Sequence, residues 1–261
     1  MAKPTTAQKL LTYVLLAPLI VASTAFFGII SLITSLWDKS GRQQHAIAQV
    51  WAKSLLMLAF SPMTIIGREK LGRVGVYASN HISYMDTPAL FGNLPFQFRI
   101  LANHYLFKIP FIGWHLTRSG QVPIDQSNLR SQIAGLNKGT GTLKSGMPLL
   151  LFPEAGRSKD GHIRSMLSGA AFMAIKAQVP LIPLALVGTH ELMPMHVYAL
   201  APRPLKLVVG DPIDTTGLTT RDAEVVTKKL HDAIAEMYYA HSDVQRPAKE
   251  EPAVSAEPLV N

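Results

Sequence analysis

The chain has 261 residues, of which 48% are hydrophobic and only 16% are charged. Soluble domains carry about 25% charged residues, so this chain is short of charge for a soluble domain. It contains no cysteine, which excludes a disulfide framework, a thiolate zinc site and a cysteine nucleophile. The formal net charge of +8 indicates an anionic partner, and composition alone leaves nucleic acid and a phosphate-bearing membrane both open.

An uncharged segment of 28 residues, Leu10–Trp37, dominates the N-terminal part of the chain. About 20 apolar residues span the core of a bilayer, so this length is sufficient. A cleaved signal peptide is disfavoured, because the apolar run continues through Ile30, beyond the hydrophobic region of a usual signal. A buried core helix rarely stays uncharged for so long. The segment therefore predicts a membrane-embedded helix.

A second, weaker apolar helix is predicted over residues 43–60, and Pro62 ends it. Residues 1–61 are thus expected to form a membrane-associated helical hairpin that anchors the chain. The sequence leaves open whether the first helix crosses the bilayer or lies in one leaflet.

From residue 62 to 240, short apolar runs alternate with helical stretches, which predicts an α/β domain with a mixed, largely parallel sheet flanked by helices. Strands are expected at 63–69, 74–79, 97–102, 120–124, 147–152, 181–187 and 204–210. Helices are expected near 106–118, 128–145, 165–178 and 220–241. The tail, 241–261, is polar and punctuated by proline, and we expect it to be disordered.

The first candidate motif, NHISYMD, covers Asn80–Asp86 directly after an apolar run. If Asp86 lies in the first turn of a helix and His81 in the preceding loop, the carboxylate can accept one imidazole N–H. The other ring nitrogen is then left as a base for a hydroxyl. The pattern holds no nucleophile of its own, so the substrate must supply one. On spacing alone, the simpler interpretation is that Asp86 only caps a helix.

The second candidate motif, FPEAGRS, follows the apolar run that ends at Phe152. Ligands of open α/β sheets bind at the carboxyl ends of strands. There Arg157 and Ser158 can present a planar cation and a hydroxyl to a phosphate. Residues 99–176 contain ten Lys and Arg against three acidic residues, which favours an anionic ligand. The alternative for Arg157 and Lys159 is an ordinary solvated loop.

Four blocks of sequence, in the same order, resemble the glycerolipid acyltransferase (PlsC-like) family. NHISYMD is similar to its NHxSxxD block and FPEAGRS to its FPEGTRS block. The stretch LFKIPFIGWHLTRSGQVPID, residues 106–125, resembles its second block, and VPLIPLAL its closing VPIVPVA block. Together the blocks cover roughly residues 62–210. Within the family, the 1-acylglycerol-3-phosphate acyltransferases also share N-terminal membrane helices.

The resemblance implies that His81 is the general base and Asp86 its partner, with Asn80 and Ser83 completing the motif. It further implies a set of residues that bind the phosphate and the acceptor: Arg157, Glu154, Ser158, Gly156 and Lys108.

Two departures from the family pattern bear on the acceptor. Ala155 and Gly156 stand where the third block usually has glycine and threonine. Residues 103–105, Asn-His-Tyr, stand where the second block usually has a lysine, and Lys108 is the nearest cation. The fold and the type of reaction are unaffected by these departures.

The resemblance implies transfer of a fatty acyl group from acyl-CoA or acyl carrier protein to the hydroxyl of 1-acylglycerol-3-phosphate, giving phosphatidic acid without an acyl-enzyme. The implied partners are membrane lipids, the lysophospholipid acceptor and the thioester donor, which is a co-substrate; no further cofactor is expected. The implied location is a membrane, with the catalytic domain on the cytoplasmic face of the inner membrane.

The residues also disfavour two kinds of partner, and they leave several other activities open. Aromatic residues are not interleaved with the basic ones, so no nucleic acid is expected. The nine histidines lack paired ligand spacing, so no metal is expected. The open alternatives are an acyltransferase for another acceptor (glycerol-3-phosphate, a lyso-aminolipid or a phosphate-free lysolipid), a membrane-tethered thioesterase, and a non-catalytic membrane-binding homologue.

Overall fold

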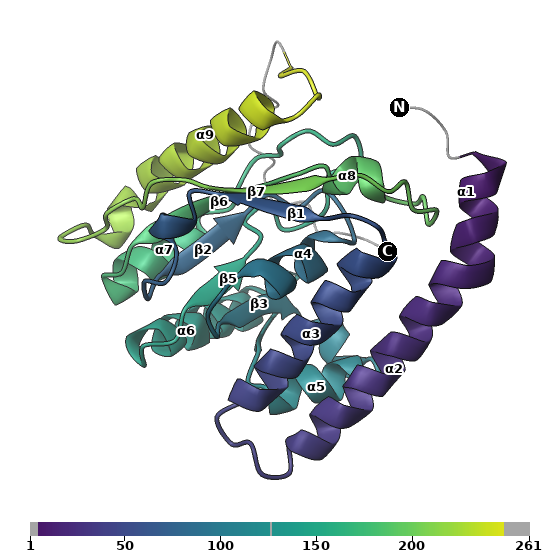
Figure 1. Ribbon diagram of the computed structural model, residues 1–261. Coiled ribbons are helices and arrows are strands. Elements are labelled where there is room, and N and C mark those ends of the chain that lie inside the picture. Colours follow the sequence, from purple (N-terminus) through teal and green to yellow (C-terminus); the bar gives the residue numbers. More distant parts are fainter. Residues whose placement is uncertain (1–4, 126, 248–261) are drawn as a thin grey trace.

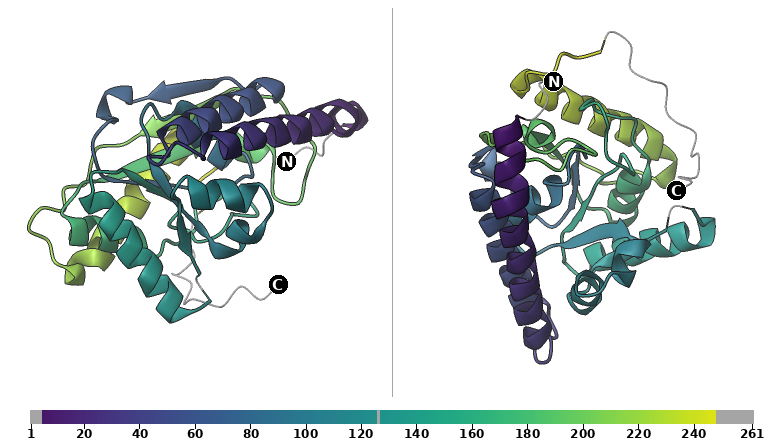
Figure 2. Two further views of the ribbon diagram at one scale, coloured as in Figure 1. Left: turned by 90° about the horizontal axis from the view of Figure 1, so that it is seen from below. Right: turned by 90° about the vertical axis from the view of Figure 1, so that its right-hand side faces the viewer.

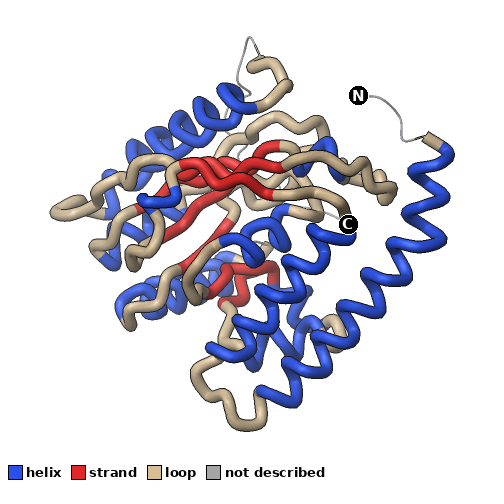
Figure 3. Tube along the Cα trace, in the orientation of Figure 1, coloured by secondary structure: helices blue, strands red, loops and turns tan. Residues whose placement is uncertain are grey.

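A computed structural model describes residues 5–125 and 127–247 of the chain. Within these residues one seven-stranded sheet has the order β1-β7-β6-β2-β5-β3-β4 (Figures 1 and 3). The strands are β1 Met63–Ile66, β2 Val76–Ser79, β3 Arg99–Asn103, β4 Val122–Ile124, β5 Leu149–Leu151, β6 Leu181–Val187 and β7 Leu205–Val209. Every pair is parallel except β6 with β7, which is antiparallel. The predicted α/β fold with a largely parallel sheet is therefore confirmed.

Helices cover both faces of the sheet, as parallel strands require. Helices α6, α7 and α9 cover one face, while α3 and α4 cover the other. Their bounds, with those of two shorter helices, are α3 Arg42–Leu58, α4 Asp86–Asn93, α5 Ile112–Arg118, α6 Leu129–Lys144, α7 Gly169–Ala177, α8 Thr189–Leu192 and α9 Ala223–His241. Residues 248–261 of the expected tail lie outside the described residues, and the division into domains stays a prediction.

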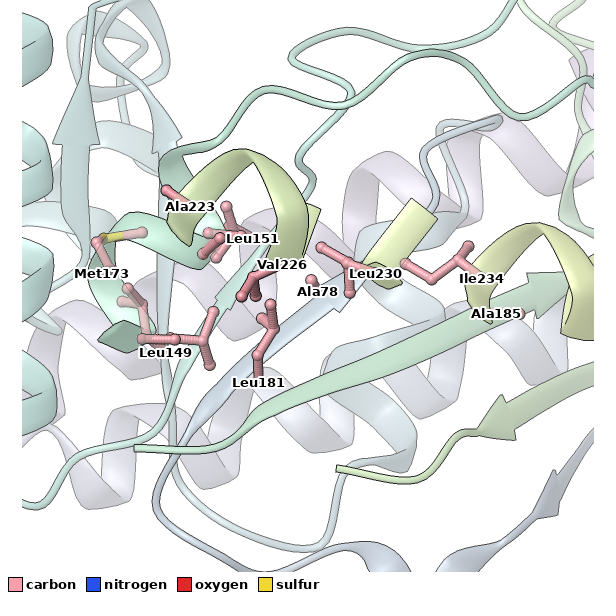
Figure 4. Close-up of a cluster of buried hydrophobic side chains, with 14 of the residues drawn as sticks. Ala78, Leu149, Leu151, Met173, Leu181, Ala185, Ala223, Val226, Leu230 and Ile234 are labelled. Atoms are coloured by element: carbon pink, nitrogen blue, oxygen red, sulfur yellow. The ribbon is translucent and has the colours of Figure 1, made fainter. Parts of the chain in front are cut away.

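The central strands β2, β5 and β6 are buried on both faces, which is why the sequence shows them as unbroken apolar runs. Side chains alternate between two cores. Leu149 and Leu181 of the sheet share one buried cluster with Val226 and Leu230 of α9, and Figure 4 shows Val226 beside Leu181. Tyr77 of β2 and Leu150 of β5 belong to the opposite core, under α3 and α4. This rigid sheet fixes the positions of the loops at its carboxyl edge.

The N-terminal helix runs through α1 Thr6–Leu10, a wider π-helical turn at Leu11–Leu16, and α2 Ala17–Thr34. The wider turn precedes Pro18, which has no N–H to donate to the carbonyl of Val14. The whole N-terminal helix, Thr6–Thr34, has 29 residues and is long and apolar enough to cross a membrane, judged by length and composition. The expected pair of N-terminal helices is present, because α3 follows and packs against α2.

Polar contacts attach this N-terminal helix to the rest of the molecule along its length. The N–H of Leu200 donates to Thr12 Oγ1 over 3.1 Å, near one end. Ser23 lies 3.2 Å from Ser54 of α3, measured between the hydroxyl oxygens, near the middle. Both views of Figure 2 show the purple helix lying alongside the body. Most of its large apolar side chains point away from the body and are exposed.

Candidate active site

His81 and Asp86 meet at the carboxyl end of β2. Nδ1 of His81 lies 2.8 Å from Oδ2 of Asp86, the first residue of α4. The same oxygen accepts the N–H groups of Ile82 (2.7 Å) and Ser83 (2.8 Å). Asp86 is fully buried and turns its carboxylate back toward His81, and the N-cap of α4 is Met85. The carboxylate therefore orients the imidazole instead of capping the helix, and Nε2 is the nitrogen left to accept a proton.

The loop after β5 holds the ring and the main chain of His81. Phe152 stacks on the imidazole with a centroid distance of 3.9 Å and an interplanar angle of 13°. The N–H of His81 donates to Oε1 of Glu154 over 3.0 Å. Its carbonyl accepts the N–H of Ser158 over 2.8 Å. His81 is thus held in position by contacts with a segment about 70 residues away in sequence.

Glu154 is deeply buried, and both of its carboxylate oxygens accept hydrogen bonds from backbone N–H groups. Oε1 accepts from His81, and Oε2 accepts the N–H of Arg164 over 3.3 Å. Burial raises the pKa of Glu154 well above its ordinary value, although these hydrogen bonds act against the rise. The side chain is not among the residues that line the cavity described below. Its role in binding the acceptor stays a prediction.

Asn80 and Ser83 join the first motif to neighbouring segments. The side chain of Asn80 pairs with the backbone of Leu186 in β6, donating over 3.0 Å and accepting over 2.7 Å. The hydroxyl of Ser83 donates to the carbonyl of Met193, beyond α8, over 2.8 Å. Both side chains thereby fix the loop that carries His81.

The loop of the second motif has a left-handed turn at Ala155, with φ of 61°. Such a turn favours glycine, because Cβ crowds the backbone of any L-residue there. A Cβ at Gly156 would lie 3.3 Å from Nη1 of Arg164, so glycine lets that guanidinium approach. The hydroxyl of Ser158 donates to Asp160 over 2.8 Å and is used within the loop. Its predicted contact with the acceptor stays untested.

Arg157 presents its guanidinium without a carboxylate partner among the described residues. Its Cζ lies 4.4 Å from the ring centroid of Tyr84, which makes a cation–π contact. Nε of Arg157 is buried and has no hydrogen-bond partner within the described part of the chain. Tyr84 in turn packs near Tyr198, with ring centroids 5.9 Å apart. The cation is therefore held by aromatic packing, and its N–H groups remain to bind an anion.

A cavity of about 1240 Å³ joins these groups to the N-terminal helices. One part is polar, with His81, Arg157, Gly156 and Ser158 in its wall. The other part is mainly apolar and runs between α2, α3 and α5, where its wall includes Phe27, Gly28, Trp51, Phe111, Ile112 and Leu116. This arrangement can hold an anionic group beside a base while a long apolar chain fills the remainder.

The cations that line the cavity differ in part from those predicted to bind the phosphate. Lys108 is exposed and does not line the cavity, so its predicted phosphate role has no support in this geometry. Arg164 and Lys159 do line it, and neither was predicted as a ligand. Tyr84 was also missed. The dense basic residues of 157–164 were the signal available for the two cations, whereas nothing local indicated the contact of Tyr84 with Arg157.

Comparisons with known proteins agree with the four sequence blocks. The family model described as Acyltransferase matches residues 63–187. The chloroplastic 1-acyl-sn-glycerol-3-phosphate acyltransferase LPAT1 of Arabidopsis thaliana is 37% identical over 163 residues, 61% of this chain and 45% of the relative. A 1-acyl-sn-glycerol-3-phosphate acyltransferase of Chlamydomonas reinhardtii is 35% identical over 187 residues, 70% of this chain and 52% of the relative. The chain thus spans about half the length of these relatives.

A solved structure is similar over most of the chain. The crystal structure of the 1-acyl-sn-glycerophosphate acyltransferase PlsC from Thermotoga maritima aligns with a TM-score of 0.74 at 24% identity. The alignment covers 87% of this chain and 93% of that one. The two molecules share their fold, including the N-terminal helices.

Proposed function

Since this chain belongs to the acyltransferase family, we propose that it moves a fatty acyl group from a thioester donor to the free hydroxyl of 1-acylglycerol-3-phosphate, giving phosphatidic acid. The donor is acyl-CoA or acyl carrier protein. The observation that carries the proposal is the 2.8 Å contact of His81 with Asp86. The wall of the same cavity contains Arg157, a cation with no carboxylate partner among the described residues. The named relatives act as 1-acyl-sn-glycerol-3-phosphate acyltransferases, which supports this choice of acceptor.

The mechanism uses the substrate's own oxygen as nucleophile. Nε2 of His81 takes the proton of the acceptor hydroxyl while the hydroxyl oxygen attacks the thioester carbon. Asp86 accepts the Nδ1–H and stabilises the transient imidazolium. The tetrahedral intermediate then expels the thiolate, which takes the proton back from His81. An ester bond forms, a thioester bond breaks, and no acyl-enzyme is needed because the thioester is already activated.

Arg157 binds the phosphate of the acceptor and thereby aims the hydroxyl at His81. A guanidinium matches the oxygens of a phosphate through paired N–H donors. Lys159 and Arg164, which line the same cavity, add positive charge there. Lysolipids without a phosphate lack the group that this cluster recognises, so they are poor acceptors under this proposal.

The N-terminal helices attach the enzyme to a membrane by lying in one leaflet. The first helix contacts the body from Thr12 to Ser31. A helix that crossed the bilayer upright would carry the attached body into the hydrocarbon core. The exposed apolar face of the first helix instead fits a helix that lies flat in the leaflet. The thioester donor and the basic body favour the cytoplasmic face of the inner membrane.

Product analysis with the full chain in vesicles tests the proposal. Acyl-CoA is offered with 1-acylglycerol-3-phosphate, glycerol-3-phosphate, a lyso-aminolipid or lysophosphatidylcholine, and the lipid products are identified by mass spectrometry. Phosphatidic acid is the expected main product. Free fatty acid alone would reveal a thioesterase, faster acylation of another lysolipid would replace the acceptor, and no acyl transfer to any acceptor would contradict the whole proposal.

A further inference from the structure

The segment between β3 and β4, Tyr105–Arg118, turns apolar side chains toward solvent. Its large exposed side chains, each at least 37% accessible, are Tyr105, Ile109, Phe111, Ile112 and Trp114. The segment contains no acidic residue, and its cations Lys108 and Arg118 are exposed. A gathering of apolar side chains with a basic edge typically marks a surface that binds a partner.

The backbone holds this segment with its aromatic side chains outward. Phe111 has φ of 62°, a strained value for a bulky residue. Gly113 lies directly against the backbone of Phe107, which leaves no room for a Cβ. The ring of Phe111 contacts Trp114 at a centroid distance of 5.2 Å. The exposure of these rings is therefore built into the fold and is not the result of a loose loop.

This surface continues from the outer face of α2. Ser31 Oγ of α2 lies 2.6 Å from Nδ1 of His115, and Arg118 donates to Ser35 Oγ over 3.3 Å. A groove of about 530 Å³ between the two helices is lined mainly by Leu32, Ile33, Leu36 and Trp114. Figure 1 shows α5 beside the lower part of α2. The apolar surfaces of the two helices thus form one continuous face.

We propose that Tyr105–Arg118 is a second membrane-inserting segment, which lies beside α2 in the same leaflet and contacts anionic phospholipids. The proposal rests on the membrane attachment proposed above for the N-terminal helices. Exposed cations lie within this segment and just after α2 in the chain: Lys108 and Arg118, and Lys39 and Arg42. Tryptophan and basic side chains are the residues that membrane interfaces favour.

Insertion of this segment also gives lipid chains a dry path to the site. Phe111 and Ile112 line the large cavity and are exposed on the surface at the same time. They therefore lie where the cavity meets the leaflet. A chain that enters there passes from hydrocarbon to the apolar cavity without crossing water.

Tryptophan fluorescence tests the insertion independently of activity. The chain has three tryptophans, at positions 37, 51 and 114. The double variant Trp37→Phe, Trp51→Phe reports on Trp114 alone, and Trp51→Phe, Trp114→Phe reports on Trp37. Each full-length variant is reconstituted in vesicles of phosphatidylglycerol and phosphatidylcholine whose acyl chains carry bromine near the headgroup end.

We expect bromine to quench Trp114 as strongly as Trp37, to within about twofold, because the proposal puts both exposed rings in the same leaflet. Quenching of Trp37 without quenching of Trp114 overturns this proposal and leaves the attachment by the N-terminal helices intact. Quenching of neither overturns both. Acyl transfer plays no part in this readout, so a wrong choice of acceptor cannot produce these results.

A charged side chain introduced into the exposed apolar face tests whether this face contacts the membrane during acyl transfer. Trp114→Glu should lower the rate with acceptor embedded in vesicles by roughly tenfold, because a carboxylate is disfavoured at an anionic interface. With a short-chain, water-soluble acceptor the rate should stay within about twofold, since Trp114 does not line the large cavity. Val225→Glu, an equally exposed position on α9, is the matched control. Equal losses with both acceptors, or the same loss in the control, contradict the proposal.

Discussion

The two ends of the large cavity are built in different ways. At the polar end, His81 is held by hydrogen bonds to its ring, its N–H and its carbonyl, and by a stacked phenyl ring. At the apolar end, the wall consists of side chains from α2, α3 and α5, joined by only a few polar contacts such as Ser31 with His115. The first end fixes one atom in place, whereas the second shapes a volume. Changes at the polar end should alter the rate, and changes at the apolar end should alter which chain is preferred.

The largest effect is expected at the base itself. His81→Ala should lower acyl transfer by about 10²–10⁴-fold, because general-base catalysis is lost. The fold should survive, since the hydrogen bonds through the backbone of residue 81 do not need the ring. Initial rates with circular dichroism as a check on folding measure this. His231→Ala, on α9, is the control, and full activity in His81→Ala would disprove the mechanism.

The second-largest effect is expected when the cation of Arg157 is removed. Arg157→Ala should raise the KM for the phosphate-bearing acceptor by about 10–150-fold, because a hydrogen bond to a charged group contributes about 1.5–3 kcal/mol. The KM for the donor should change little. Kinetics with each substrate varied in turn provide the comparison, and equal changes in both KM values would rule out a phosphate role.

Gly28 tests the apolar end. A Cβ at this position meets nothing within 4 Å, and the residue lines the cavity. Gly28→Leu should therefore fill part of the space and shift preference toward shorter acyl donors. Loss of two buried methylenes costs about 1.6 kcal/mol, or roughly 15-fold in relative kcat/KM between chain lengths. Val21→Leu, on the exposed face of α2, is the control. An unchanged chain-length profile in Gly28→Leu would argue against acyl binding there.

Tyr84 refines the picture of the polar end. Tyr84→Leu should raise the KM for the acceptor by about 2–5-fold, which corresponds to a cation–π contact of about 0.5–1 kcal/mol. Tyr84→Phe keeps the ring that faces Arg157 and should behave like the parent protein. If Tyr84→Phe loses as much as Tyr84→Leu, the hydroxyl matters and the stacking does not.

The smallest effect is expected at Ala155, where φ is 61°. Ala155→Gly should stabilise the protein by about 0.5–1 kcal/mol, because relief of the left-handed strain exceeds the entropy cost of glycine. The corresponding rise in Tm is about 2 °C, which thermal unfolding in detergent can measure. Activity should change little. A lower Tm would mean that the turn is not strained as its backbone indicates.

Much of the fold could be predicted because its signals are local. Six of the seven observed strands lie wholly within a predicted apolar run, and β3 extends one residue beyond its run, to Asn103. Strands that are buried on both faces appear in the sequence as nearly continuous apolar runs. Helix α4, Asp86–Asn93, was considered only as a helix that Asp86 would begin or cap, and its extent was not predicted, because it is short and contains Pro88 and Gly92. Tertiary packing against α3 stabilises it.

The candidate site shows the same division between local and distant contacts. The spacing of five residues allowed His81 to pair with Asp86, the resemblance to the family's first block favoured this pairing, and the structure shows the contact. The hydrogen bond from the N–H of His81 to Glu154 joins residues 73 apart, and the stacking of Arg157 on Tyr84 joins residues equally far apart in sequence. Neither leaves a pattern in the sequence, because each depends on how β2 and β5 are paired.

The attachment of the N-terminal helix along its length has a consequence for the choice of membrane. A protein whose helix crosses the bilayer must match the hydrocarbon thickness, or else tilt or deform the lipids. A helix that is fastened to the body at Thr12, Ser23 and Ser31, and that lies in one leaflet as we propose, meets only that leaflet. Thin and thick bilayers then offer it the same surface, and hydrophobic mismatch exerts no force on the site. The enzyme would sense the packing and charge of a single lipid layer and be indifferent to the layer beneath.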